Sequence, residues 1–362
     1  MTHREKLLKV FRFEKVGMLP NYDFGYWDET IERWHKEGLP QHVTQQDVER
    51  YLGLEGYGLI PSLPINVGFY HSFEEKILEE RGDHLIIQGG DGVIYEKHKT
   101  SASIPKYLKF PIETRADWVR FRDRHLDPDY PGRIDPEIRE KAKNWRKEGW
   151  PINVGGASIY GVLRGWMGLE NISIAIMTEK KWVEEMMEHL TNLTLSILER
   201  IPEGTPVDYA HWWEDMCYNR GPLISPALFE ELMVPRYQRI TDFLNQRYGI
   251  TVNVLDCDGC IYELVPGWLK GGINCMFPIE AAHTDPLVLR QRYGHQILLI
   301  GGVNKLALIA GKEAIDRELD RLAPLVEDGG YIPTVDHRVP PDVSFENYCY
   351  YLEKKKKILK LG

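Results

Sequence analysis

The strongest constraint on the fold of this chain is the alternation of short apolar runs with amphipathic segments. Eight apolar runs have the length and composition of buried strands: Gly17–Trp27, Gly56–Leu63, Trp150–Ser158, Pro206–Asp215, Gly249–Gly259, Gly271–Glu280, Gln296–Asn304 and Gly329–His337. From the third run onward, at least one helical pattern separates each run from the next. Strands that alternate with helices predict a parallel sheet. Eight such units favour a (β/α)8 barrel over an open sheet, so we predict an α/β fold with a single TIM barrel spanning residues 1–362.

The clearest helical segment is SPALFEELMVPRYQRITDFLNQRYG, which runs from Ser225 to Gly249. Ser225 is a favourable N-cap, Pro226 suits the first helical position, and Gly249 ends the pattern. We therefore predict that a helix fills the gap between the fourth and fifth predicted strands.

One region departs from the alternation. Residues 68–130 contain the stretch ERGDHLIIQGGDGVIYEKHKT, in which apolar and polar residues alternate around Gly89-Gly90-Asp91-Gly92. This pattern predicts a β-hairpin. The glycines lack the spacing and the following helix of a dinucleotide-binding motif. We interpret residues 68–130 as an insertion packed near the mouth of the barrel.

Composition and charge narrow the functional classes. The chain is 43% hydrophobic and 27% charged, and its net charge of -9 argues against nucleic acid or an anionic membrane as a partner. Its N-terminus is charged and lacks the apolar core of a signal peptide, and no apolar run is long enough to span a membrane. Five cysteines do not make a disulfide framework, so we expect a cytoplasmic protein. The basic run Lys354–Lys357 is typical of a solvated last helical turn.

Polar and aromatic side chains gather where the predicted strands end. They are Asp23, Tyr26 and Trp27; Tyr160; His211, Trp212, Trp213 and Glu214; Asp256 and Asp258; Glu280; and His337. In a barrel the C-terminal strand ends form the catalytic face. Bringing several carboxylates together is costly unless a cation or a proton compensates, and a divalent metal is the simplest explanation. Asp, Glu and His ligands suit a catalytic zinc.

The stretch VNVLDCDGCIYEL interleaves Cys257 and Cys260 with Asp256 and Asp258. A structural zinc knuckle would need a second ligand pair of matching spacing, and a redox pair would need a helix start. The simplest interpretation is two small, partly buried cysteines beside functional residues, although a direct role in metal binding stays open. The two aspartates have a structural alternative too, an Asx-turn that closes the strand.

Several segments resemble the uroporphyrinogen decarboxylase superfamily. They are REKLLKVFRFEKVGMLP, RGPLISPALFEELMVPRYQRITDFLNQRYG, LDCDGCIYELVPGWLKGGINCMFPIE, YGHQILLIGGVNK and GGYIPTVDHRVPPDVSFENYCYY. The resemblance covers nearly the whole chain in order and implies a single (β/α)8 barrel. True decarboxylases carry an arginine-rich segment near the N-terminus that grips the carboxylates of a tetrapyrrole. This chain has NYDFGYWDETIERW there instead, which argues against porphyrinogen decarboxylation.

The chain is more similar to the zinc-containing, corrinoid-dependent methyltransferases of the superfamily. Thiol-using members carry His-x-Cys-Gly after the fifth strand and a later Cys. Placed on Gly259, this motif puts Asp256 at the His position, Asp258 at the first Cys position and His337 at the later Cys. The resemblance therefore implies a zinc ion held by Asp256 or Asp258, Glu280 and His337. Oxygen and nitrogen ligands leave zinc more electrophilic than thiolates do, which favours an oxygen-bearing methyl donor.

The resemblance implies the reaction class: a methyltransferase that demethylates a methyl ether, with an aromatic ether favoured, and passes the methyl group to Co(I) of cobalamin. No Asp-x-His-x-x-Gly motif is present, so the cobalamin is expected on a separate corrinoid protein that docks at the C-terminal face of the barrel. A homodimer is an expectation from the family. Catalytic roles are predicted for His211, Glu214, Asp258 and His337. Contacts to the substrate are predicted for Tyr22, Asp23, Tyr26, Trp27, Tyr160, Trp212 and Trp213, for each of which packing in the core is the alternative.

The sequence is also compatible with two other functions. One is a decarboxylase of a smaller carboxylic acid that uses the same cationic site as an electron sink. The other is a barrel that only binds and delivers a methylated ligand or a corrinoid. Zinc content separates the metal-dependent functions from the binding protein. Methyl transfer to cob(I)alamin without release of CO₂ separates the methyltransferase from the decarboxylase.

Overall fold

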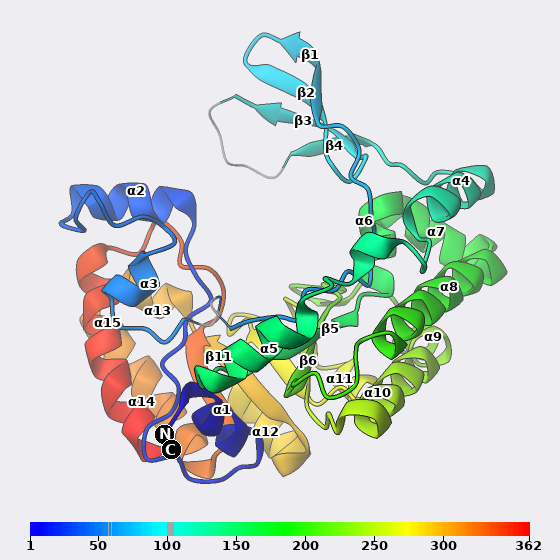
Figure 1. Cartoon of the computed structure of the whole chain (residues 1–362). Helices are drawn as coiled ribbons and strands as arrows, with labels where there is room; N and C mark the ends of the chain where they lie inside the picture. Colours follow the sequence, from blue (N-terminus) through cyan, green and yellow to red (C-terminus); the bar gives the residue numbers. More distant parts are fainter. Residues whose placement is uncertain (57, 59, 100–104) are drawn as a thin grey trace.

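The computed structural model describes residues 1–56, 58, 60–99 and 105–362. Its centre is a parallel sheet of six strands in the order β12-β11-β10-β9-β6-β5 (Figure 1). The strands are β5 (Asn153–Ala157), β6 (Tyr209–Trp213), β9 (Asn253–Asp256), β10 (Cys275–Ile279), β11 (Leu298–Val303) and β12 (Tyr331–Val335). Each lies within one of the last six predicted runs. The predicted α/β class and these six strands are confirmed.

The first two predicted strands are reduced to single contacts at the two edges of this sheet. Tyr26 forms a parallel bridge with Val339, and Ser62 forms one with Asn153. The backbone N–H of Glu55 donates to the carbonyl of Asn21 at 2.9 Å, which connects the two edge segments. This arrangement is compatible with a closed barrel. Among the described residues no strand ladder joins the two edges, and residues 57 and 59 of the second run lie outside them.

Helices surround the sheet (Figure 1). They are α1 (His3–Phe11), α2 (Asp28–Lys36), α3 (Val48–Tyr51), α4 (Arg115–His125), α5 (Ile138–Lys147), α6 (Tyr160–Met167), α7 (Leu169–Thr178), α8 (Lys180–Glu199), α9 (Pro226–Leu232), α10 (Val234–Tyr248), α11 (Val265–Lys270), α12 (Pro286–Tyr293), α13 (Lys305–Ala310), α14 (Lys312–Asp328) and α15 (Phe345–Ile358). A short antiparallel pair, β7 (Cys217–Tyr218) and β8 (Gly221–Pro222), follows β6. No helix of the described residues is both long and apolar enough to cross a bilayer.

The helical segment after Ser225 is divided where the sequence predicts one helix. The Ser225 hydroxyl accepts from the N–H of Leu228, and Gly249 ends α10 at a φ of 69°, as predicted. The helix breaks at Met233, between α9 and α10. Pro235 follows the break, and a proline inside a helix removes one hydrogen bond and clashes with the preceding turn. The proline therefore suits the start of α10 better than the middle of one long helix.

The predicted hairpin is confirmed within a four-stranded antiparallel sheet. β2 (His84–Gln88) pairs with β3 (Ile94–His98) around the predicted glycine turn. β1 (Lys76–Arg81) and β4 (Lys106–Lys109) extend this sheet on either side. The sequence does not reveal these two edge strands, because both are exposed along their length and rich in charged residues. Residues 100–104 of the insertion lie outside the described residues.

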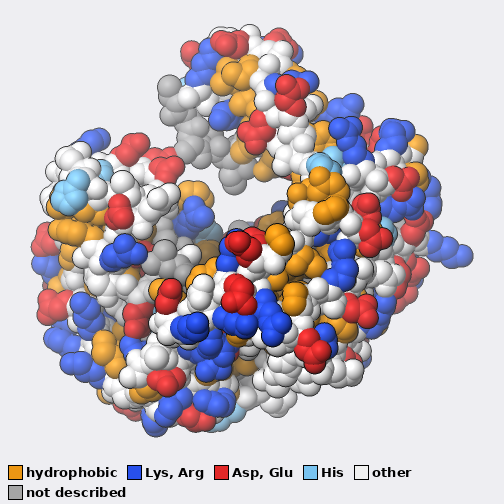
Figure 2. All heavy atoms as spheres, in the orientation of Figure 1, with side chains coloured by type: hydrophobic (Ala, Val, Ile, Leu, Met, Phe, Trp, Pro, Cys, Tyr) orange, Lys and Arg blue, Asp and Glu red, His pale blue; other side chains and the backbone are white. Residues whose placement is uncertain are grey.

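The β1–β4 sheet stands over the end of the barrel where α2 and α6 begin (Figure 1). The chain after it is fixed to the barrel: the Ile112 N–H donates to the carbonyl of Trp166 at 3.1 Å, and Phe110 packs against Gly168. A Cβ on Gly168 would lie 2.4 Å from the Phe110 ring, and the φ of this glycine is +81°. A space-filling view shows a hollow between the β1–β4 sheet and the barrel (Figure 2).

Candidate functional site

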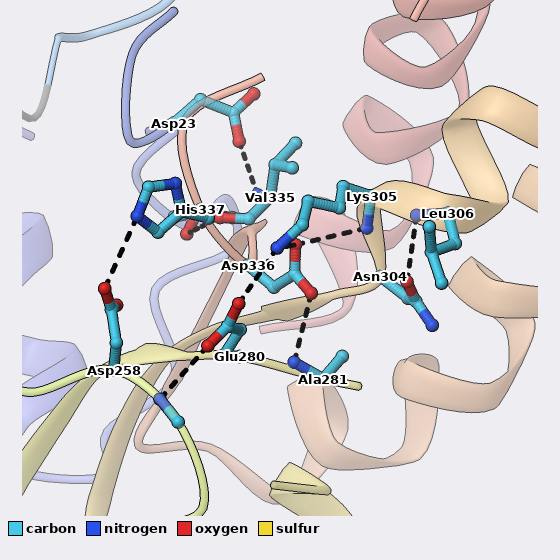
Figure 3. A network of polar contacts seen from close by, with 12 residues as sticks. Asp23, Asp258, Glu280, Ala281, Asn304, Lys305, Leu306, Val335, Asp336 and His337 are labelled. Carbon is cyan, nitrogen blue, oxygen red and sulfur yellow. Dashed lines mark hydrogen bonds and ion pairs between the residues drawn. The ribbon is translucent and has the colours of Figure 1, made fainter. Parts of the chain in front are cut away.

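The C-terminal ends of the parallel strands bring the predicted polar residues to one end of the sheet. The residues that follow β9, β10 and β12 form one polar network (Figure 3). Its members come from segments far apart in the sequence, because neighbouring parallel strands present their carboxyl ends side by side. This is the end of the barrel at which the hollow opens, and it is where TIM-barrel enzymes place their active sites.

Asp258 and His337 form an ion pair in this network. The Nε2 atom of His337 lies 3.4 Å from Oδ2 of Asp258, and Figure 3 shows the two side chains pointing toward each other. Burial alone would lower the pKa of His337, but the hydrogen bond and the negative charge of Asp258 outweigh it and raise the pKa. The other oxygen of Asp258, Oδ1, is buried and has no hydrogen-bond partner among the described residues.

Glu280 is held by a lysine and by the backbone. Its Oε1 atom accepts from the Lys305 ammonium at 3.1 Å, and its Oε2 atom accepts from the N–H of Gly259 at 3.1 Å. The same ammonium lies 3.7 Å from Oδ1 of Asp336, whose two oxygens also accept the N–H groups of Lys305 and Ala281. Lys305 therefore supplies positive charge between two carboxylates (Figure 3).

A cavity of about 740 Å³ lies beside this network. It is lined by Phe24, Gly25, Tyr26, Gln45, Gln46, Glu49, Gly58, Ile60, Ser62, Asn153, Tyr209, His211, Asp256, Phe277 and Arg338. Its volume is in the range of sites for small ligands, and its lining mixes aromatic rings with a few polar groups, as such sites commonly do. Two residues predicted from the sequence to act in chemistry or metal binding, His211 and Asp256, contribute to this lining.

Asp256 and His211 are both held neutral. Burial, together with the negative charges of Asp258 and Asp215, raises the pKa of Asp256 to about 8. The carboxyl group therefore carries a proton at neutral pH. Burial lowers the pKa of His211 to about 4, so its imidazole is uncharged. Asp256 can donate a proton into the cavity, and His211 can exchange a hydrogen bond with a ligand.

The predicted metal ligands do not assemble into one site. Among the described residues no three His, Cys, Asp or Glu side chains are placed to hold a metal ion. Asp258 is paired with His337, whereas Glu280 is paired with Lys305. A catalytic zinc takes about three protein ligands. As these side chains stand, they do not fit a zinc ion, and zinc stays a prediction from the sequence.

Glu214, for which a catalytic role is predicted from the sequence, is bonded to the start of α6. The side chain is fully buried and accepts four hydrogen bonds: from the N–H groups of Ile159, Tyr160 and Gly161 at 2.8–2.9 Å, and from the hydroxyl of Tyr237 at 2.8 Å. The three N–H groups belong to the first turn of α6, where a negative charge is favourable. Glu214 thus fixes the start of α6 and has no open acceptor for a substrate.

Most of the residues predicted to contact the substrate belong to the core. Tyr22, Asp23, Tyr26, Tyr160 and Trp212 are each at most 2% exposed. The phenol of Tyr26 contacts that of Tyr348, although other atoms of Tyr26 line the cavity. Trp27 and Trp213 differ, because they are 42% and 41% exposed. Of the predicted aromatic contacts, these two rings are the ones open to a ligand.

Asp23 binds a buried lysine. Its carboxylate lies 3.3 Å from the ammonium of Lys355 and accepts hydrogen bonds from the hydroxyls of Tyr348 and Tyr351 and from the N–H of Val335. Asp23 and Lys355 are both fully buried. The prediction that the whole basic run 354–357 is solvated is therefore wrong for Lys355.

The Cys257 thiol contacts the backbone carbonyl of Asp258 at 3.7 Å, but in the part of the chain that the structure describes neither cysteine side chain joins the acids, His337 and Lys305 of the polar network. The Cys257 side chain is 2% exposed, and its Sγ accepts from the N–H of Met216 at 3.3 Å. Burial raises the pKa of this thiol, which opposes the thiolate form that binds metals. Cys260 is half-buried, and its backbone N–H donates to the carbonyl of Tyr218.

Two residues of this end of the barrel are absent from the predicted site. Lys305 directly follows Asn304 at the end of β11, and Arg338 directly follows His337 after β12. The sequence signal for both is their place at strand ends, the same signal that selected the acids and histidines. A pattern of acids and histidines indicates a metal site, and basic residues are not part of that pattern.

A second cavity, of about 490 Å³, lies at the opposite ends of the strands. Asn253 and Asn274 line it, and their amides bind backbone atoms of neighbouring strands. We assign these amides to holding the strand starts together, because their hydrogen bonds are used within the sheet.

The chain was compared with families of known proteins. Residues 157–357, more than half of the chain, match the family described as Uroporphyrinogen decarboxylase (URO-D). The chain belongs to the uroporphyrinogen decarboxylase family. This stretch begins at the end of β5 and includes the strands from β6 to β12, so the family match contains the polar network and most of the sheet.

Comparison with solved structures agrees with this membership. The chain is similar to a methyltransferase from Methanosarcina mazei, with a TM-score of 0.56 and 14% sequence identity, over 99% of each chain. At this identity the likeness establishes the fold. None of the curated proteins compared with the chain matches it. The resemblance to the uroporphyrinogen decarboxylase superfamily read from the sequence is confirmed.

Proposed function

We propose that this member of the uroporphyrinogen decarboxylase family is a methyltransferase that removes the methyl group of a small aryl methyl ether and passes it to the cobalt of a separate corrinoid protein. The observation that carries the proposal is the cavity of about 740 Å³, which combines the rings of Phe24 and Phe277 with the protonated carboxyl of Asp256. The motif resemblance and the full-length likeness in fold to a methyltransferase support it.

In the proposed ether cleavage, different residues of the cavity have different roles. The rings of Phe24 and Phe277 pack edge to face at 4.7 Å and offer an apolar wall to an aromatic substrate. When docked, the corrinoid supplies the Co(I) nucleophile that accepts the methyl group. The carbon–oxygen bond breaks, and its electron pair stays on the ether oxygen. Asp256 lines the cavity and holds a proton for this oxygen, and His211 orients the substrate.

The corrinoid protein is expected at the C-terminal ends of the strands. Figure 2 shows the hollow between the β1–β4 sheet and the barrel on this side of the molecule. A methyl group in the cavity would be approached through this hollow. Zinc on Asp256 or Asp258, Glu280 and His337 is a separate proposal from motif register, and no step here depends on it.

A decarboxylase of a small carboxylic acid is the second candidate. The observation that favours it is Arg338, a cation in the lining of the cavity, to which Asp256 contributes a protonated carboxyl that can protonate a carbanion. One lining arginine suits an acid with one carboxylate better than a porphyrinogen, which carries many.

The deciding experiment is a methyl-transfer assay with purified protein, cob(I)alamin and a panel of aryl methyl ethers. Formation of methylcobalamin and of the free phenol, without CO₂, is the expected result, and an Asp256→Asn variant is the negative control. Release of CO₂ from methoxybenzoic acids without methylcobalamin supports the decarboxylase. If neither product forms with any member of the panel, the proposed function is rejected.

A further inference from the structure

Arg338 is held against an aromatic ring at the edge of the cavity. The residue follows β12 and lines the cavity with its exposed side chain. Its guanidinium carbon lies 5.5 Å from the centroid of the Trp27 ring. The other neighbour of this ring is His337, stacked at 5.9 Å with an interplanar angle of 21°. A guanidinium stacked on an indole keeps its N–H donors at the edge of its plane, where they are available to a ligand.

The charge of Arg338 is not compensated by the protein. No Asp or Glu of the described residues lies within ion-pair distance of it, in contrast to Arg164 and Lys305. Arg164 is paired with Asp215 at 2.5 Å, and Lys305 is paired with Glu280 at 3.1 Å. Arg338 is also the one Lys or Arg among the described residues that line the cavity.

The cavity lining contains two acids. They are Asp256 and Glu49. Burial and the charge of Asp23 raise the pKa of Glu49 to about 7, so the negative charge of this acid is reduced near neutral pH. The cavity therefore offers one fixed positive charge, two amide side chains from Gln45 and Gln46, and an aromatic wall.

We propose that the substrate carries one anionic group, a carboxylate on its aromatic ring, and that Arg338 binds this carboxylate while stacked on Trp27. A carboxylate accepts two parallel N–H hydrogen bonds from one guanidinium. This pairing sets the orientation of the substrate ring and increases the affinity of the substrate for the protein. The carboxylate is an anchor that does not react. This proposal rests on the proposed methyl transfer for the identity of the ring, but the anchor is tested by binding alone.

The experiment measures equilibrium binding by calorimetry for three probes: 4-methoxybenzoate, its neutral amide 4-methoxybenzamide, and benzoate. Wild type is expected to bind 4-methoxybenzoate about tenfold or more tightly than the amide. Arg338→Met should remove this preference, and Arg338→Lys should restore only part of it, because lysine keeps the charge and loses the planar pair of donors. Arg317→Met removes an exposed arginine of α14 and should leave the preference unchanged.

The possible outcomes distinguish carboxylate binding by Arg338, called the anchor, from the proposed methyl transfer. Equal affinity of wild type for the acid and the amide, including no measurable binding of either, overturns the proposal. A preference that survives in Arg338→Met overturns it as well. If the preference for the acid depends on Arg338 while no methyl group reaches cob(I)alamin, the carboxylate anchor stands and the proposed methyl transfer fails. If methyl transfer proceeds while the acid and the amide bind with equal affinity, the methyl transfer stands and the anchor fails.

Discussion

His337 and Asp258 face each other across the ends of β12 and β9, with Nε2 and Oδ2 3.4 Å apart. This pair sets the charge around the cavity carboxyl of Asp256. The negative charge of Asp258 adds to burial in raising the pKa of Asp256 to about 8, whereas the positive charge of His337 opposes it. The proton proposed for the leaving oxygen therefore depends first on burial and also on charged residues that do not line the cavity themselves.

The first prediction is the pH dependence of methyl transfer. If protonated Asp256 is the proton donor, activity should fall as pH rises through about 8, because the donor loses its proton. His337→Gln removes a positive charge that favours the ionised carboxyl, so this variant should move the falling limb to higher pH. Asp256→Asn should lower kcat by about 10²–10⁴-fold and remove the limb. The measurement is kcat against pH with saturating cob(I)alamin.

The same profiles distinguish Asp256 from His337 as the donor. A His337 donor would make His337→Gln lose both the limb and most of its activity, whereas an Asp256 donor leaves the activity and shifts the limb. Asp258→Asn gives a second check, because removing its negative charge should lower the pKa of Asp256 and shift the limb to lower pH. A limb at the same pH in all three proteins would rule out both assignments.

The second prediction concerns Lys305 and metal binding. The Lys305 ammonium bonds Glu280 and lies 3.7 Å from Asp336, so it supplies charge where the sequence predicts zinc. Lys305→Met leaves these two carboxylates without that cation. We expect the variant to bind Zn²⁺ more tightly than wild type, by about tenfold or more, because unpaired carboxylates attract a divalent ion. Metal per chain, after loading and the same dialysis for both proteins, is the measurement.

Wild type carrying one tightly held zinc would show that Lys305 does not take the place of a metal and that the zinc predicted from the sequence is right. In that case Glu280→Gln and His337→Ala should lower the zinc content. The double variant Cys257→Ser, Cys260→Ser should keep it, because the buried Cys257 thiol contacts backbone atoms only and serine roughly preserves side-chain volume.

The strand ends were predictable from the sequence because buried strands and helices leave different apolar periods. His211, Asp256, Glu280 and His337 all follow or end strands of the sheet, as the pattern predicts. What the pattern cannot provide is the partner of each side chain. Glu280 was expected on a metal and is bonded to Lys305, which lies 25 residues further along the chain. Such pairings depend on how neighbouring strands are placed, and a single sequence does not encode them locally.

The burial of charged residues is the second feature that could not be predicted from the sequence. A run of four lysines near the end of a helix is normally solvated. Because all four residues are of the same type, the sequence does not show that Lys355 points inward while its neighbours point outward. The same is true of Glu214, which follows two tryptophans and has the residue type of an acid catalyst. Its four donors come from α6 and α10, which are remote in the sequence.

The third prediction tests whether Glu214 has a structural role or a catalytic role. Glu214→Gln keeps the size of the side chain but replaces one acceptor by an N–H₂ group that faces donors. We expect a loss of about 1.5–3 kcal/mol in the free energy of unfolding, the range for hydrogen bonds to a charged group. Activity per folded molecule should change by much less. The measurements are urea unfolding and kcat on the same preparation, and a loss of kcat without a loss of stability would restore Glu214 to the catalytic site.

The fourth prediction uses the buried pair of Asp23 and Lys355. Asp23→Asn leaves the ammonium buried without its counter-charge, so it should cost roughly 3–5 kcal/mol of stability. Lys355→Met should cost less, because Asp23 keeps its hydrogen bonds from Val335, Tyr348 and Tyr351. The double variant should be more stable than Asp23→Asn alone, since methionine fills the place of the lysine stem and no buried ammonium remains.

Urea unfolding of the four proteins of this double-mutant cycle gives the coupling between Asp23 and Lys355 directly. A strong coupling, with the double variant recovering much of the loss, is the expected outcome. The KM of the folded variants for the methyl donor should match that of wild type, because both side chains are fully buried. Additive losses of stability would mean that the two charges act independently. A raised KM in Asp23→Asn at normal stability would instead support the substrate contact that the sequence predicts for Asp23.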